Sequence, residues 1–173
     1  ALLNGLKDPV VGLSMGQTAE KIAHRFGITR EMMDEYATQS HLRLHQAHQE
    51  GLMTEIEPMF DRKGNLYDHD EGVRPDSSPA KLAKLKPAFK VNGTVTAGTS
   101  SQMTDGAAAT LVVSEEFLKK LGDKPLARFV AFAARGVPPE IMGIGPVEAI
   151  PAALKLAGLK LADIGLIELN EAF

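Results

Sequence analysis

The sequence predicts an α/β fold built from two regions of different character. From Ala107 onward, three apolar segments alternate with two helical ones, and such a strand–helix–strand–helix–strand order is the sign of a layered α/β core. Residues 1 to about 103 instead predict helices and loops with little sheet. An apolar fraction of 44% and a charged fraction of 24% are those of an ordinary globular protein. We therefore place a domain boundary near Met103.

Two consecutive helices are expected in the first region. Apolar side chains recur at helical spacing over residues 15–26, and Gly27 ends this helix. Thr29 can cap a second helix that runs to about Glu50, with Gly51 as its terminator. The remainder is predicted as a short extended piece at 56–60, a turn at 61–65, irregular loop at 64–80 and one helical turn at 81–85.

The second region supplies the predicted sheet. Residues 107–113 form a continuous apolar run that is typical of a strand buried on both faces. Residues 126–135 are mostly apolar and compatible with a strand, and residues 164–169 are predicted as another apolar strand. One helix is predicted at 115–121 and ends at Gly122. The other is predicted at 146–157, with a proline near its start and Gly158 after it.

Composition excludes several classes of protein. The net charge of −3 is too small to indicate steering toward nucleic acid, and no apolar run is long enough to span a bilayer. The chain has no cysteine, so disulfides and thiolate metal sites are excluded. The first residues have neither a signal-peptide pattern nor an initiator methionine, which we interpret as the middle of a longer polypeptide.

Two partial motifs indicate structure rather than chemistry. His41, His45 and His48 share a helix face, but Leu42 stands where a zinc protease needs glutamate, so we predict no metal site. The turn at 143–148 starts like a dinucleotide fingerprint and lacks its third glycine, so we predict that it feeds a core helix.

Two segments predict a ligand site. Residues 94–109 form a run of small hydroxylated residues and glycines, which suits a backbone passing close to a ligand. Ser101 lacks both the G-x-S-x-G elbow and a histidine base, so we expect it to hydrogen-bond a ligand rather than to attack it. Asn170 ends a predicted strand, where α/β sheets place ligands, and its amide can hold a water or an oxyanion.

Five ordered segments resemble the thiolase family: Met-Gly-Gln-Thr-Ala-Glu at 15–20, Leu-Ala-Lys-Leu-Lys-Pro-Ala-Phe at 82–89, the small-residue run at 94–109, Met-Gly-Ile-Gly-Pro at 142–146, and Asn-Glu-Ala-Phe at 170–173. The resemblance implies an acyltransferase acting on coenzyme A thioesters, with a layered αβαβα core, present here in part, and an inserted α-rich loop domain that holds CoA. Residues 1–103 would be most of that loop domain. Residues 104–124 would end the N-terminal half, and residues 125–173 would begin the C-terminal half.

The resemblance also implies roles for single residues. The implied catalytic residue is Asn170, which positions a water in an oxyanion hole. The implied substrate and CoA contacts are Met15 at the acyl and pantetheine tunnel, Arg74 at the nucleotide, Phe89 and Ala97 at adenine and pantetheine, Ser101 at pantetheine, Met103 near the acyl group, and Ala172 and Phe173 in the pocket wall. No metal and no tightly bound cofactor are implied, since coenzyme A is the co-substrate.

The implied reaction is thiolytic cleavage of a 3-ketoacyl-CoA through a cysteine acyl-enzyme, as in fatty-acid β-oxidation. Neither cysteine of the family occurs in this chain, nor does a histidine in the family's Gly-His-Pro setting. We expect the nucleophile upstream of Ala1 and the other two groups downstream of Phe173, so this polypeptide alone should be inactive.

Three alternatives remain beside the degradative enzyme. They are a biosynthetic thiolase that forms acetoacetyl-CoA, a ketoacyl synthase, and a non-catalytic CoA- or lipid-binding remnant. Ser14 and the run at 100–102 favour the degradative type, and Asn170 disfavours the synthase. The resemblance further implies a homodimer or homotetramer, a β-oxidation multienzyme complex as partner, no nucleic acid, no membrane span, and a bacterial cytoplasm or an organellar matrix as location.

Overall fold

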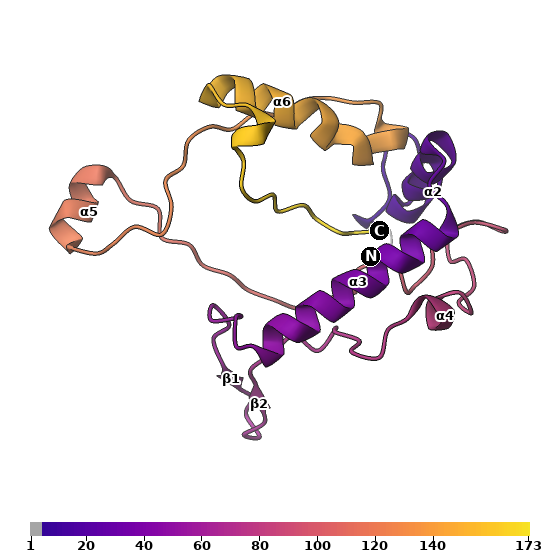
Figure 1. The fold of residues 1–173 in the computed structure, drawn as a ribbon, viewed down its shortest axis with the longest axis horizontal. Coiled ribbons are helices and arrows are strands. Elements are labelled where there is room, and N and C mark those ends of the chain that lie inside the picture. Colours follow the sequence, from indigo (N-terminus) through magenta and orange to yellow (C-terminus); the bar gives the residue numbers. More distant parts are fainter. Residues whose placement is uncertain (1–4) are drawn as a thin grey trace. The chain divides into compact units, whose positions relative to one another are not determined.

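The structure is a computed structural model, and it describes residues 5–173 (Figure 1). The described chain divides into two units. The first unit contains the residues up to Gln102 together with Pro138–Gly143 and Asn170–Phe173. The second unit contains Met103–Val137 and Ile144–Leu169. The candidate site lies in the first unit.

Helices α2 (Met15–Phe26) and α3 (Arg30–Gln49) begin and end where the sequence predicts. Ser14 caps α2 in a reciprocal box with Gln17, and Gly27 ends the helix at a φ of 66°, which a glycine adopts without strain. The Thr29 side chain accepts a hydrogen bond from the Met32 N–H at the start of α3. Both predictions are confirmed because the signals that end a helix are local.

A small hairpin follows α3. Strands β1 (Met59–Phe60) and β2 (Leu66–Tyr67) pair antiparallel, with Met59 opposite Tyr67. Asp61 Oδ1 accepts hydrogen bonds from the N–H groups of Lys63 and Asn65, which confirms the predicted turn. The prediction of irregular loop for residues 64–80 was wrong at β2, because a two-residue strand carries no alternation to detect.

Helix α4 (Pro79–Leu82) is one turn long and begins two residues before its predicted position, since Ser78 caps it. Arg30 of α3 fixes the chain beyond it. The Arg30 guanidinium donates to both oxygens of Asp34 and also to the backbone carbonyl of Leu85, at 3.0 Å. The Asp34 side chain is almost fully buried, so this ion pair, in which the single Arg30 Nε–H is shared between both Asp34 oxygens, is shielded from solvent.

The described part of the second unit holds two helices that match the prediction. Helix α5 (Glu115–Leu121) is capped by Ser114 and ends at Gly122. Helix α6 (Gly145–Ala157) ends at Gly158 with a φ of 69°. The 3-10 turn η2 (Leu161–Asp163) also belongs to this unit, whereas nearly all of the 3-10 turn η1 (Pro139–Ile144) belongs to the first unit.

The prediction of three strands in the second half of the chain was wrong. Residues 107–113, 126–135 and 164–169 form no strand in the described structure, where the sheet consists of β1 and β2. Their large apolar side chains are exposed, with Leu111 at 79%, Leu126 at 104% and Leu166 at 74%. The apolar composition predicted burial, but a strand exists only where a neighbour completes its hydrogen bonds. The described chain is therefore mostly helical, although the predicted class was layered α/β.

Candidate functional site

A buried carboxylate fixes the loop that follows α4. Glu20 of α2 is 6% exposed. Its Oε1 accepts hydrogen bonds from the N–H groups of Thr94 and Val95 at 2.9 and 2.8 Å, and its Oε2 accepts one from the Thr94 hydroxyl at 3.1 Å. A Cβ at Gly93 would stand 2.2 Å from Glu20 Oε1, so only glycine fits there. The carboxylate thus replaces water for backbone groups that would otherwise be buried unpaired.

The same loop folds back on itself. The Ala88 N–H donates to the Val95 carbonyl at 2.9 Å, and Thr96 and Val95 are almost fully buried. The Thr99 hydroxyl accepts from the Thr96 N–H, and the Ser100 hydroxyl donates to the Thr96 carbonyl at 2.7 Å. These bonds leave Ala97 exposed at the tip of a loop whose flanks are fixed. A small exposed residue on a fixed loop lets a ligand approach the backbone.

Phe89 links the helix start to the end of the chain. Its ring covers Gly16, where an added Cβ would stand 2.3 Å from the ring carbons. On another side the ring meets Phe173 edge to face, with centroids 5.6 Å apart. Met15, the neighbour of Gly16, is half-buried at this same helix start. Three segments far apart in the sequence therefore share one aromatic contact.

The last four residues are bound to the loop through Ser101. The Ser101 N–H donates to the Ala172 carbonyl at 3.0 Å, and its hydroxyl donates to the Glu171 carbonyl at 2.9 Å. The sequence analysis expected Ser101 to contact a ligand. In the structure its donors go to the backbone, and its hydroxyl lone pairs remain as acceptors.

Glu171 binds the other side of the tetrapeptide to α3. Its Oε1 accepts from the Tyr36 hydroxyl at 2.8 Å, and its Oε2 accepts from the Ser40 hydroxyl at 2.6 Å. The hydrogen bond and the negative charge of Glu171 raise the pKa of Tyr36 above its ordinary value. Asn170 is exposed and directly precedes Glu171.

His41 follows Ser40 on α3, and its side chain contacts the main chain of Arg74. The Arg74 N–H donates to His41 Nδ1 at 3.2 Å, which requires an unprotonated nitrogen there. Burial, and then the charge of Arg74, lower the pKa of His41, while Glu171 opposes them. The Arg74 residue is exposed, so its guanidinium can meet a ligand.

The structure thus brings most of the predicted site residues into the first unit. Contacts join Phe89 to Phe173 and Ser101 to Ala172, and α3 joins the Arg74 segment to the segment that carries Asn170. Met103 begins the second unit and is not part of these contacts.

Glu20, Tyr36 and Glu171 were not among the predicted site residues. Glu20 carried a signal, because it shares one helical face with Gly16 and Ala23, both of which are buried. An acidic residue on such a face needs partners. Tyr36 and Glu171 carried no comparable signal, since their contact joins distant parts of the sequence.

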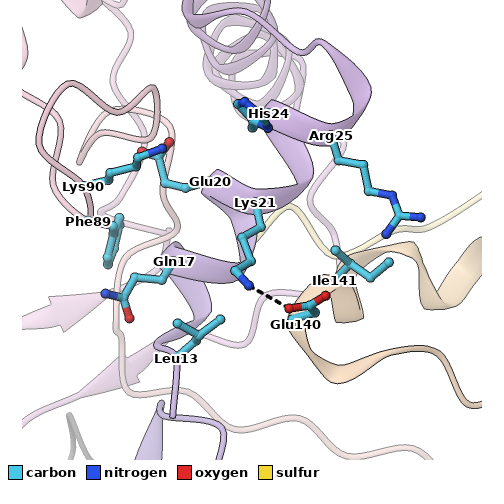
Figure 2. Close-up of a pocket in the computed structure, with 10 residues that line it drawn as sticks. All are labelled: Leu13, Gln17, Glu20, Lys21, His24, Arg25, Phe89, Lys90, Glu140 and Ile141. Carbon is cyan, nitrogen blue, oxygen red and sulfur yellow. Dashed lines mark hydrogen bonds and ion pairs between the residues drawn. The ribbon is translucent and has the colours of Figure 1, made fainter. Parts of the chain in front are cut away.

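A cavity of about 470 Å³ lies beside this region (Figure 2). Figure 2 shows Lys21 of α2 reaching Glu140 across it, with Nζ and Oε2 2.7 Å apart. Lys21 lowers the pKa of Glu140. The remaining lining residues are Leu13, Gln17, Glu20, His24, Arg25, Phe89, Lys90 and Ile141. The wall contains side chains of both charge signs, so it does not present a uniform field for an ion.

Over the part of the chain that is described, no group of three or more His, Cys, Asp or Glu side chains could hold a metal ion. The same residues include no helix long and apolar enough to cross a membrane.

Comparisons with known proteins identify the family of this chain. Residues 1–116 match the family model described as the thiolase N-terminal domain, and residues 123–173 match the thiolase C-terminal domain. The chain belongs to the thiolase family. It contains no cysteine, so the chain itself provides no cysteine nucleophile.

Individual relatives agree with the family assignment. The chain is 50% identical to a 3-ketoacyl-CoA thiolase of Bacillus subtilis, over 96% of this chain and 46% of the relative. The solved structure of the human mitochondrial 3-ketoacyl-CoA thiolase in complex with CoA superposes with a TM-score of 0.95 at 46% identity, over 99% of this chain and 44% of that one. An acetyl-CoA acetyltransferase of Bacillus anthracis gives the same TM-score at 42% identity, over 99% and 45%. The chain therefore spans less than half the length of these relatives.

Proposed function

We propose that this chain forms the CoA-holding part of a degradative thiolase and contributes Asn170 to its catalytic centre. The observation that supports this most is the convergence of Gly16, Phe89, Ser101 and the residues from Asn170 to Phe173 in one unit. These residues come from four of the five thiolase-like segments. A site formed by distant segments is more specific evidence than any one motif.

The residues suit a CoA thioester in chemistry. The exposed Arg74 guanidinium can pair with phosphate oxygens in a bidentate way. The half-buried Phe89 ring and the exposed Ala97 offer apolar surface to adenine and to the pantetheine arm. The lone pairs of the Ser101 hydroxyl can accept a hydrogen bond from a pantetheine amide. Met15, Ala172 and Phe173 complete the wall in this proposal, and the role of Met103 near the acyl group rests on the resemblance alone.

The catalytic contribution of the chain is electrostatic. The Asn170 amide donates hydrogen bonds without changing charge, so it can hold a water against a developing oxyanion. The thiolate that attacks the 3-keto carbonyl must come from polypeptide other than these 173 residues, because they include no cysteine. We therefore expect the isolated chain to bind CoA without turning over a 3-ketoacyl-CoA.

Two alternatives make different predictions. A biosynthetic, acetoacetyl-CoA-forming thiolase would use the same CoA site, but Ser14, which caps α2 here, stands where the resemblance implies a histidine in many biosynthetic members. A non-catalytic CoA- or lipid-binding remnant is favoured by the absence of cysteine alone. We place the protein in fatty-acid breakdown because two of the relatives described above are 3-ketoacyl-CoA thiolases.

Assembly and location follow from the same proposal. We expect a homodimer or homotetramer for the complete enzyme, with a β-oxidation multienzyme complex as a further partner. The relatives include bacterial, mitochondrial and peroxisomal proteins, and we place this one in a bacterial cytoplasm, with an organellar matrix as the alternative.

The proposal is tested by calorimetric titration of the chain with CoA. Arg74→Ala should weaken binding by about 1.5–3 kcal/mol, the range for a hydrogen bond to a charged group. Arg62→Ala is the control, since Arg62 lies in the turn of the β1–β2 hairpin and is exposed. Equal affinities for the two variants would remove Arg74 from the site.

The catalytic half of the proposal needs the missing thiolate. A chimera in which these 173 residues replace the homologous segment of the Bacillus subtilis relative contains the remaining segments of that relative, which we expect to supply the thiolate. Cleavage of a 3-ketoacyl-CoA by this chimera, and none by the chain alone, is the expected result. A chimera that binds CoA but never cleaves would favour the remnant.

A further inference from the structure

Both oxygens of the Glu171 carboxylate are occupied by hydroxyl groups of one helix. Tyr36 and Ser40 lie four residues apart on α3, so their side chains share one face. The Tyr36 hydroxyl is 2.8 Å from Oε1, and the Ser40 hydroxyl is 2.6 Å from Oε2. Two contacts to two different oxygens fix the orientation of the carboxylate as well as its position.

A second pair of hydrogen bonds fixes the backbone of the same residues. The Ser101 hydroxyl and N–H donate to the carbonyls of Glu171 and Ala172 at 2.9 and 3.0 Å. The segment is therefore fixed by α3 through a side chain and by the loop through its main chain. Asn170 is the next residue, so the location of its Cα follows from that of Glu171.

We propose that Tyr36, Ser40 and Glu171 form a clamp that positions Asn170 for its work on the catalytic water. The inference rests on the proposed function, because it assumes that Asn170 contacts the reacting water. The members of the clamp are positioning residues and touch no substrate in this account. The proposal gives Glu171 the task of orienting the segment and assigns it no proton transfer.

The charges around the clamp agree with this role. The hydrogen bond and charge of Glu171 raise the pKa of Tyr36, while the Arg43 charge opposes them. The phenol therefore stays protonated, and remains a donor, across the neutral range. His41 faces the same carboxylate from α3, with Arg74 beside it, and the charge of Glu171 raises its pKa against the stronger effect of burial.

Kinetics test the clamp in the chimeric complete thiolase described above. Tyr36→Phe and Ser40→Ala should each lower kcat by about 10- to 100-fold, since misplacement of a catalytic group by about 1 Å has an effect of that size. The KM for CoA should change by less than a factor of about 2, because no CoA contact is removed. Tyr67→Phe, in the hairpin, is the control and should leave kcat unchanged.

A double variant separates positioning from general loosening. Tyr36→Phe combined with Glu171→Gln should be no slower than the slower single variant, because both changes disrupt one unit. The clamp would be overturned if the double variant lost the product of the two single losses in kcat. It would also be overturned if kcat fell in step with Tm across the variants.

A spectroscopic readout needs no catalysis. The chain has two tyrosines, so Tyr67→Phe leaves Tyr36 as the single phenol, and its ionisation is followed by ultraviolet absorbance. Glu171→Gln should lower the pH of that ionisation, because it removes the negative charge and replaces the carboxylate acceptor by a weaker amide oxygen. An unchanged midpoint would overturn the clamp, whatever the kinetics.

Asn170→Ala distinguishes a failure of the clamp from a failure of the proposed function. If it abolishes turnover while Tyr36→Phe and Ser40→Ala match the parent, the clamp is wrong and the proposed function stands. If Asn170→Ala also matches the parent, the proposed catalytic role is wrong and the clamp falls with it.

Discussion

The rings of Phe89 and Phe173 meet at 87°, with their centroids 5.6 Å apart. This edge-to-face geometry places the positive edge of one ring against the negative face of the other. Phe89 belongs to the loop that Glu20 fixes, and Phe173 belongs to the segment that follows Asn170. The aromatic pair is therefore one of the contacts, beside the Ser101 hydrogen bonds, through which the loop and the last four residues stabilise each other.

A double-mutant cycle measures this coupling. Phe89→Ala and Phe173→Ala should each lower the free energy of unfolding, and the interaction between them should be about 0.5–1.5 kcal/mol. Urea unfolding supplies the four energies. Phe89→Ala with Phe60→Ala, in the exposed hairpin, is the control pair and should be additive within about 0.5 kcal/mol. Additivity of the Phe89 and Phe173 changes would mean that the contact contributes nothing.

Gly16→Ala tests the packing on the other side of Phe89. The new Cβ would stand 2.3 Å from the ring, so the ring or the helix start must move. We expect a loss of about 1–3 kcal/mol, the usual result of overpacking. The same change in a Phe89→Ala background should lose much less, because the opposing ring is gone.

Gly145→Ala is the matched control, because no heavy atom lies within 4 Å of a Cβ at this position, where α6 begins. It should be neutral or stabilising. A Gly16→Ala variant as stable as this control would contradict the observed contact between Gly16 and Phe89.

Glu20→Gln should loosen the loop that carries Phe89 and Ala97. The amide nitrogen of glutamine cannot accept the hydrogen bonds that one carboxylate oxygen now accepts from the Thr94 and Val95 segment. We expect a loss of about 1.5–3 kcal/mol in the free energy of unfolding, as for hydrogen bonds to a buried charge. CoA affinity should fall as well, since the loop would no longer be preorganised.

Glu35→Gln serves as the comparison for that variant. Glu35 lies on α3 and is exposed. Its replacement by glutamine removes the same single negative charge. Titration calorimetry and urea unfolding on both variants complete the test. If the two variants behave alike, the buried carboxylate does not organise the loop.

Acid should destabilise the first unit through His41. Burial and the Arg74 charge lower its pKa in the folded chain below the ordinary value of 6.5. The unfolded chain therefore takes up the proton first as the pH falls, and the free energy of unfolding drops from about pH 6.5 down to the folded-state pKa. Protonation of Nδ1 would also remove the acceptor of the Arg74 N–H.

His41→Gln should reduce this acid-induced loss, measured by urea unfolding at pH values on both sides of 6.5. His69 provides the opposite case, because the Asp68 hydrogen bond raises its pKa at an exposed position. His69→Gln should not reduce the loss. A pH dependence that is the same in His41→Gln and in the parent would show that His41 is not its source.

The helices were predictable because the residues that begin and end them lie next to them in the sequence. Ser14 and Gly27, Thr29 and Gly51, and Ser114 and Gly122 each enclose a helix, and each signal acts within a few residues. The strands depend on pairing between distant segments. Apolar runs therefore predicted where the chain should be buried, but they did not predict where a hydrogen-bonded partner exists.

The candidate site was predictable only as a set of residues. Resemblance selected Phe89, Ser101 and Phe173, and the structure adds what they contact. The roles of Glu20 and Glu171 depend on hydrogen bonds across most of the first unit, and no local pattern encodes those. The site roles themselves all stay predictions, for Met15, Arg74, Phe89, Ala97, Ser101, Met103, Asn170, Ala172 and Phe173 alike.

The unpaired segment at 126–135 has a practical consequence. Its backbone N–H and C=O groups lie between exposed Leu126, Phe129 and Phe132 side chains, and this combination is a template for intermolecular cross-strand association. Solutions of the separate 173-residue polypeptide should therefore become turbid as concentration rises, and light scattering would register this self-assembly before any loss of helix signal.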